Sequence, residues 1–275
     1  MTIKEIIEIK NNKLPETVPV KEVMDKYIPG IDIETIPKRN GGIWVVAGAG
    51  GSGKTSMMLN FFKNNKLYRG KFDNIYYICP EASMLSVENH PFEGHDKVFT
   101  ELTLEVLEGI YQELNAIKET TINNRKKKLL KNKNKEPTFD SYDDVPQNDD
   151  DEDDDIKYNC VFIDDMADSY KDDKTTKVLS KMLIKARHLC TMFIFTLQSY
   201  LYFPKILRKQ ITNITIFQPN NIEEWNSLAG ELINLKGDDS IKLHNFVFDK
   251  EHTHLDIDTK TNTYYKNFNK LEFKK

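Results

Sequence analysis

Residues 48–56 carry the spacing of glycine, lysine and threonine that binds a nucleotide phosphate chain. The segment reads G-A-G-G-S-G-K-T from Gly48 to Thr55 and follows the apolar run Ile43–Ala47. Glycines let backbone N–H groups turn around a phosphate chain, which side chains would obstruct. Lys54 supplies a charge for the β- and γ-phosphates, and the Thr55 hydroxyl is placed to bind Mg²⁺. The pattern predicts a Walker A loop for ATP, in which the contacts come from Gly48, Ala49, Gly50, Gly51, Ser52, Gly53, Lys54, Thr55 and Ser56.

Two acidic residues stand where a second apolar run ends. Asp164 and Asp165 follow the apolar residues 160–163, which is typical of a Walker B strand. We expect Asp164 to hold Mg²⁺ opposite Thr55, as in P-loop NTPases generally. Asp165 is placed to orient and deprotonate an attacking water molecule. The alternative is a buried strand that merely ends in a polar turn.

Three further polar residues are candidates for the reaction. Gln198 ends the β-rich run 190–197, and it can sense the γ-phosphate if that strand lies between the Walker A and Walker B strands. Otherwise its amide caps backbone groups. Arg208 projects from a short helix and, in a ring of subunits, is a candidate to stabilise charge at the neighbour's γ-phosphate. Arg187 is the second candidate for this role, and a structural ion pair is the alternative for both.

The segments that must position these residues alternate between strand and helix. Strands are expected at 43–47, 72–80, 159–164, 190–198 and 211–217, and helices at 56–63, 102–117, 174–189 and 205–210. This order predicts an α/β fold with a mostly parallel sheet and helices on both faces. Carboxyl ends of parallel strands face the ligand crevice, so the candidate residues are expected to meet there.

The remaining segments divide the chain. Residues 1–40 are expected to be an N-terminal adaptor, and residues 41–275 a P-loop ATPase domain. Within this domain, residues 118–157 form a charged insertion, predicted to be disordered or weakly helical and to act as a solvated loop or an electrostatic gate. Residues 219–275 form a C-terminal extension that is predicted to be largely strand after one helix. Its His252 and His254, without nearby cysteines, are expected to be solvated.

Composition limits the class of protein and its compartment. The chain has 275 residues and 39% hydrophobic residues, with no apolar run long enough to span a membrane and no secretory signal. Cys79, Cys160 and Cys190 lie in or beside apolar runs, which predicts reduced thiols in an intracellular, reducing compartment. The formal net charge is −4, yet the run 149–155 alone holds seven acids. The rest of the chain therefore carries a small positive net charge, which could allow one face to bind a polyanion.

The combination of Walker A, Asp164-Asp165, Arg187-His188, Gln198 and Arg208 resembles the genome-packaging ATPases of the FtsK/HerA superfamily. Within it, the sequence is most similar to the ATPases of large DNA viruses of eukaryotes, including the poxvirus type, and of virophages. The resemblance covers residues 41–218; the 118–157 insertion lies outside the shared pattern.

The resemblance implies a RecA-like core and a ring, commonly a hexamer. It also implies ATP-driven translocation of double-stranded DNA into a preformed capsid, with capsid proteins as further partners. The location would then be the host cytoplasm or virus factory, and the virion. The resemblance implies that Lys54 contacts the phosphates and that Thr55 and Asp164 hold Mg²⁺. It also implies that Asp165 is the base, that Gln198 is the sensor, and that Arg208 acts on a neighbouring subunit.

Three other functions are compatible with a phosphate loop. A P-loop kinase usually needs several arginines to clamp acceptor phosphates, and this chain has five in all. An AAA-type remodeller or assembly switch would need a helical lid domain, whereas the tail is expected to be largely strand. A non-catalytic binder would hold nucleotide without turnover.

Overall fold

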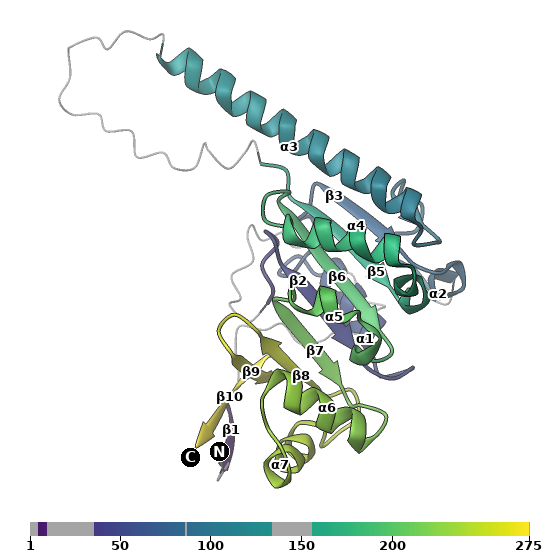
Figure 1. The fold of residues 1–275 in the computed structure, drawn as a ribbon, viewed down its shortest axis with the longest axis vertical. Coiled ribbons are helices and arrows are strands. Elements are labelled where there is room, and N and C mark those ends of the chain that lie inside the picture. The colour runs from purple at the N-terminus through teal and green to yellow at the C-terminus, as the bar shows by residue number, and fades with distance from the viewer. Residues whose placement is uncertain (1–4, 10–35, 86, 134–155, 275) are drawn as a thin grey trace, which may run out of the picture.

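The computed structural model describes residues 5–9, 36–85, 87–133 and 156–274, and the described chain forms one ten-stranded mixed sheet with helices on both faces (Figure 1). Residues 10–35 of the predicted adaptor and 134–155 of the predicted insertion lie outside the described residues. In space the strands follow the order β1-β10-β9-β8-β7-β2-β6-β5-β3-β4. Their bounds are β1 Glu5–Ile9, β2 Ile43–Ala47, β3 Asn74–Ile78, β4 Val98–Phe99, β5 Asn159–Asp164, β6 Thr191–Leu197, β7 Asn213–Phe217, β8 His254–Asp258, β9 Thr263–Lys266 and β10 Asn269–Lys274.

The strands from β4 to β7 along the sheet are all parallel and form its first part. The strand β6 lies between β2, which leads into the phosphate loop, and β5, which ends in the two acids. The register pairs Ala47 with Leu197 and Asp164 with Thr196. The carboxyl ends of these three strands therefore meet at one edge of the sheet.

Burial explains why these segments read as continuous apolar runs. Every residue of β2, β5 and β6 is buried, which is typical of a parallel sheet covered on both faces. On one face Trp44 and Phe162 pack in a core with Met58 and Phe62 of the first helix. Alternate strand residues face a second core on the opposite side, among them Val45.

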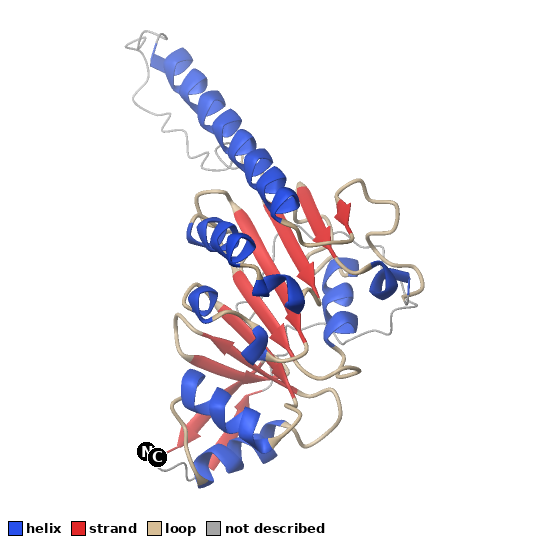
Figure 2. Ribbon diagram, turned by 45° about the vertical axis from the view of Figure 1, so that its right-hand side comes forward, coloured by secondary structure: helices blue, strands red, loops and turns tan. Residues whose placement is uncertain are grey.

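The helices are distributed unequally between the two faces (Figure 2). One core contains α1, and the other takes buried side chains from α3, α4, α5, α6 and α7. In the described ranges, every helix falls short of the length or the apolarity that a bilayer-spanning segment needs. The helix bounds are α1 Lys54–Lys63, α2 Glu81–Leu85, α3 Leu104–Lys133, α4 Asp173–Ile184, α5 Lys205–Arg208, α6 Ile222–Leu232 and α7 Asp238–Val247.

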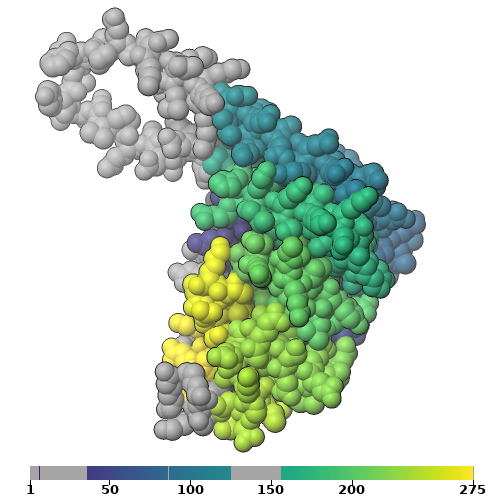
Figure 3. Space-filling view, viewed as in Figure 1, coloured from purple at the N-terminus to yellow at the C-terminus, as the bar shows by residue number. Residues whose placement is uncertain are grey.

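The C-terminal extension continues the sheet in antiparallel fashion. The strand β8 pairs with β7, and β9 and β10 follow in a meander. The strand β1, from the predicted adaptor segment, then pairs with β10. Figure 3 shows that the extension and α3 occupy opposite ends of the molecule. The prediction of a mostly parallel α/β core with a strand-rich extension is confirmed.

Two segments differ from the sequence-based expectations. The helix α3 continues to Lys133, so residues 118–133 of the insertion, predicted to be disordered or weakly helical, belong to a long regular helix. This stretch contains no glycine or proline and is rich in residues that favour helix. Its many charges and few apolar residues made this helix propensity easy to underestimate from the sequence. The extension also contains a second helix, α7, in which Ser240, Leu243 and Val247 are buried at helical spacing. The expectation that the tail after α6 is largely strand is therefore wrong for residues 238–247.

Candidate active site at the carboxyl edge of the sheet

The phosphate loop connects β2 to α1 and depends on glycine at two positions above all. Gly53 immediately precedes α1 and has a φ of 103°, a left-handed conformation that only glycine adopts readily. Gly48 has no room for a side chain, because a Cβ there would lie 2.6 Å from Cβ of Phe217 and 2.8 Å from Oγ of Ser52. The loop is thus packed closely against the end of β7.

Lys54 is held inside the loop. Its ammonium donates hydrogen bonds to the carbonyl oxygens of Gly48 at 2.7 Å and Ala49 at 2.9 Å. The residue is only 9% exposed, and this burial lowers the pKa of Lys54, while the charges of Asp165 and Asp164 act in the opposite direction. Lys54 and both acids therefore share one electrostatic environment.

Asp164 is buried at the end of β5 and fixed by two hydroxyl groups. Its Oδ2 accepts a hydrogen bond from the Tyr77 hydroxyl at 2.9 Å, and its Oδ1 accepts one from the Thr196 hydroxyl. Burial raises the pKa of Asp164, and these two hydrogen bonds lower it. Sequence reasoning missed Tyr77 and Thr196. The available signal was that each is a polar group near the carboxyl end of a strand expected in the same sheet.

Asp165 and Gln198 are in direct contact. The backbone of Asp165 turns into the left-handed region, with a φ of 53°, and its N–H is anchored on the carbonyl oxygen of Thr196 at 3.2 Å. This turn leaves Oδ2 of Asp165 to accept a hydrogen bond from Nε2 of Gln198 at 3.1 Å. The condition set for Gln198 is met, because its strand lies between β2 and β5.

The two candidate arginines lie away from these residues. All three guanidinium nitrogens of Arg208 donate within its own chain, to the carbonyl oxygens of Phe203 and Leu201 and to Glu231 at 2.8 Å. Its guanidinium also lies over the ring of Tyr200. A trans-acting role for Arg208 stays a prediction, and it would require these contacts to open.

Arg187 precedes β6 and therefore lies at the amino edge of the sheet, opposite the phosphate loop. Its side chain packs over Gly41, where a Cβ would lie 2.2 Å from the arginine Cγ. The structure does not bring Arg187 together with the other site residues of its own chain.

The two histidines of the extension are not simply solvated, which corrects the sequence-based expectation. His254 is buried between the rings of Phe217 and Phe268, and its Nδ1 lies 2.9 Å from Asp256. His252 is exposed, but its Nδ1 lies 3.0 Å from the carbonyl oxygen of Ser52 in the phosphate loop. Strand pairing of β8 with β7 brings His252 to the loop, and no local pattern in the sequence signals this contact.

The residues present fit a nucleotide with its metal ion. The buried Ser52 hydroxyl has no hydrogen-bond partner within the described part of the chain, as expected of a donor that awaits a phosphate oxygen. Within the same described residues, no three His, Cys, Asp or Glu side chains form a complete metal cage. Mg²⁺ commonly binds through one or two carboxylates plus substrate phosphates, so Asp164 with Thr55 suits it.

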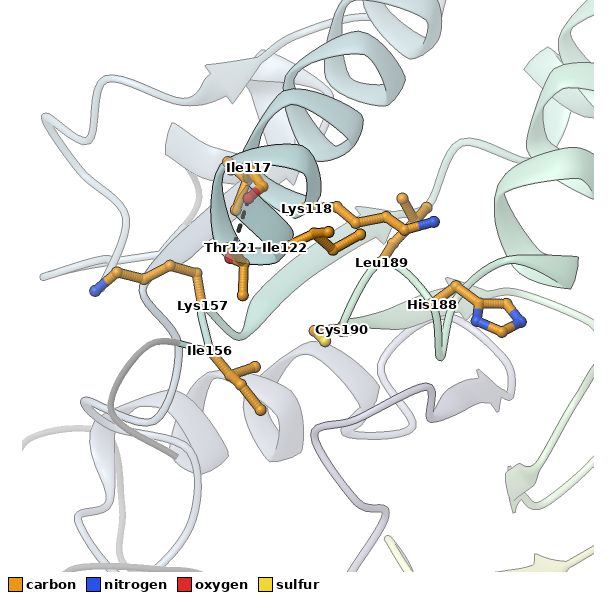
Figure 4. Close-up of a pocket in the computed structure, with 9 residues that line it drawn as sticks. All are labelled: Ile117, Lys118, Thr121, Ile122, Ile156, Lys157, His188, Leu189 and Cys190. Atoms are coloured by element: carbon orange, nitrogen blue, oxygen red, sulfur yellow. Dashed lines mark hydrogen bonds between the residues drawn. The ribbon is translucent and has the colours of Figure 1, made fainter. Parts of the chain in front are cut away.

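A cavity of about 160 Å³ lies at the opposite edge of the sheet, between α3 and the starts of β5 and β6 (Figure 4). It contains none of the residues predicted to bind or hydrolyse nucleotide. Its lining is formed by Ile117, Lys118, Thr121, Ile122, Ile156, Lys157, His188, Leu189 and Cys190.

The fold is that of a RecA-like P-loop ATPase, in which β6 separates the strand that leads into the glycine-rich loop from the strand that ends in two acids. Comparison with solved structures agrees. The DNA-packaging ATPase B204 of Sulfolobus turreted icosahedral virus matches with a TM-score of 0.52 and 13% identity, over 83% of this chain and 98% of B204. The genome-packaging NTPase B204 of Sulfolobus turreted icosahedral virus 2, bound to AMPPCP, matches with a TM-score of 0.51 and 15% identity, over 83% and 97%.

These similarities confirm the predicted resemblance at the level of the fold. No protein-family model matches the sequence, and comparison with curated proteins gives no match.

Proposed function

We propose that this chain is an ATP-hydrolysing motor that assembles as a ring and translocates double-stranded DNA into a viral capsid. The observation that carries hydrolysis is the hydrogen bond between Gln198 and Asp165, in the electrostatic environment of Lys54. The fold shared with the B204 packaging ATPases supports the packaging role. Location in an infected cell or virion stays a prediction.

The site residues divide the hydrolytic step among them. Asp165 accepts the proton of a water molecule whose oxygen attacks the γ-phosphorus, while the bond from that phosphorus to the bridging oxygen breaks and ADP leaves with phosphate. Gln198 fixes the orientation of the Asp165 carboxylate. Lys54 would exchange the two loop carbonyls that it now contacts for phosphate oxygens. Asp164 and Thr55 would hold Mg²⁺, which when bound neutralises charge on the phosphates.

The extension favours a motor over an AAA-type remodeller. A remodeller would need a helical lid that moves as a separate unit, and α6 and α7 do add helices to the tail. However, β8 pairs directly with β7 of the ATPase sheet, and Trp225 and Leu243 belong to the same core as the parallel strands. The extension is therefore built into the ATPase body.

The test is ATP hydrolysis with and without long double-stranded DNA, at low and moderate salt. Phosphate contacts from lysines are non-specific, so we expect DNA to stimulate turnover and salt to weaken the stimulation. Asp165→Asn should bind AMPPCP as the wild type does and lose turnover by about 100-fold or more, because it cannot take the proton. Lys54→Ala should lose nucleotide binding altogether.

The outcomes separate the parts of the proposal. Normal turnover in Asp165→Asn would rule out this carboxylate as the base. A turnover rate that does not change with DNA at any salt concentration would favour the remodeller. The assay would then be repeated with the capsid protein present. Phosphate transfer to an acceptor without phosphate release would indicate a kinase.

A further inference from the structure

The turn between α7 and β8 contacts the phosphate loop through one side chain. Nδ1 of His252 lies 3.0 Å from the carbonyl oxygen of Ser52, a contact that joins positions 200 residues apart. A Cβ placed on Gly53 would lie 3.4 Å from the same nitrogen and 3.8 Å from Cγ of the ring. The imidazole therefore lies against the last two residues of the loop before Lys54.

This turn is fixed by contacts of its own. Lys266, buried on β9, donates to the Asp249 carboxylate at 2.8 Å and to the Phe246 carbonyl oxygen at 2.9 Å. The Thr253 hydroxyl donates to the Lys250 carbonyl oxygen at 2.8 Å. Because β8 begins immediately afterwards and pairs with β7, the sheet itself sets the position of the imidazole.

The direction of the hydrogen bond follows from its acceptor. A carbonyl oxygen can only accept, so Nδ1 of His252 carries the proton and donates it to Ser52. The described peptide bonds are all trans, so the Ser52 carbonyl and the Gly53 N–H point in opposite directions across one peptide plane. A donor that holds the Ser52 carbonyl toward the extension thereby holds the Gly53 N–H on the opposite side of the peptide, away from the extension.

We propose that His252 is a positioning residue for nucleotide: by donating to the Ser52 carbonyl, it keeps the Gly53 N–H directed at the bound phosphates. The hydrogen bond also polarises the peptide, which strengthens that N–H as a donor. This inference rests on the proposed function insofar as the loop must bind nucleotide. It assigns to the C-terminal extension a part in the nucleotide site.

The backbone at His252 determines which variants are informative. Its φ of 61° is left-handed, a conformation that glycine, asparagine and aspartate tolerate better than alanine. Asparagine can place an N–H donor where Nδ1 lies. Aspartate has the same shape without a donor, and glycine relieves the backbone without any side chain. These three variants separate the hydrogen bond from backbone strain.

The experiment is calorimetric titration of the full chain with AMPPCP and Mg²⁺. We expect His252→Asn to bind with near wild-type affinity, and His252→Gly and His252→Asp to bind about 3- to 10-fold more weakly, as for one lost hydrogen bond. Glu251→Gln, at the exposed neighbouring position of the same turn, is the matched control and should bind as the wild type does.

Wild-type affinity in His252→Gly would overturn the inference, even if His252→Asp bound weakly, since added charge alone would then explain the aspartate variant. Equal loss in the asparagine and glycine variants would also overturn it. A wild-type chain that binds no AMPPCP, or a Lys54→Ala variant that binds it fully, would instead reject the proposed function. The two failures are therefore distinguishable.

Discussion

Asp164 illustrates how neighbouring hydroxyl groups stabilise the ionised form of a buried carboxylate. Burial alone favours the protonated acid, whereas the hydroxyls of Tyr77 and Thr196 favour the ionised form. Metal binding requires the ionised carboxylate. The two hydroxyls therefore offset part of the cost of burying this carboxylate, which we propose holds Mg²⁺.

A Tyr77→Phe variant should move the acidic limb of hydrolysis upward. Loss of the hydroxyl raises the pKa of Asp164 further, so the ionised form is lost at a higher pH as pH falls. One charge-assisted hydrogen bond corresponds to a shift of about 1 pH unit. The measurement is kcat/KM against pH. Tyr76→Phe is the control, because the Tyr76 hydroxyl contacts Lys97 instead; an unshifted limb in Tyr77→Phe would contradict the role.

Contiguous motifs made part of this site predictable from sequence. Asp164, Asp165 and Gln198 stand at the ends of apolar strand signals, Lys54 lies in the glycine-rich motif after another, and a parallel sheet brings strand ends together. Tyr77 was missed because it contacts Asp164 across 87 residues, and a tyrosine inside a predicted strand is as typical of core packing as of a site. His252 was equally hidden, since only the pairing of β8 with β7 places it at the loop.

Among the elements, α5 depends on the arginine that ends it. Arg208 is 8% exposed in its side chain and ties α5 to α6 through Glu231. It also satisfies the carbonyl oxygens of Leu201 and Phe203 in the segment that follows Gln198. The structure thus shows a role for Arg208 within its own chain.

We expect Arg208→Ala to lower the free energy of unfolding by about 1–3 kcal/mol, because the carbonyl oxygens of Phe203 and Leu201 and the Glu231 carboxylate lose a charged donor. Chemical denaturation of the unassembled chain measures this, and Lys205→Ala, exposed on the same helix, is the control. Unchanged stability would mean that these contacts are dispensable. Recovery of hydrolysis on mixing Arg208→Ala with Lys54→Ala subunits would add the role in trans.

The boundaries of helices were harder to predict than the strands of the core. The strands β2, β5 and β6 are apolar throughout, so their signal does not depend on periodicity. In α7, only Ser240, Leu243 and Val247 are buried, and the aromatic residues nearby favour strand in a local reading. The helix forms because it buries these three side chains against the rest of the protein, which outweighs the local preference for strand.

At the scale of the whole molecule, the extension completes the ATPase sheet. Removal of residues 219–275 would leave β7 with an unpaired edge and would uncover Ile214 and Ile216, which are buried beside β8. We therefore expect a variant that ends at residue 218 to be insoluble or to lack a cooperative thermal transition by circular dichroism. A soluble variant with a sharp transition would show instead that the extension is an independent domain.

The helix α3 gives the molecule a lever arm. Among the α3 residues up to Asn124, for which burial is described, the buried ones are Leu107, Ile110 and Leu114, beside Tyr111, which accepts a hydrogen bond from Lys185 of α4. The far end of the helix extends beyond the sheet (Figure 1). Thirty residues span roughly 45 Å, so a tilt of about 5° at the base displaces the far end by about 4 Å. A small change in the packing angle between α3 and α4 would therefore displace the far end of α3 by a distance that changes its contacts with a neighbouring molecule.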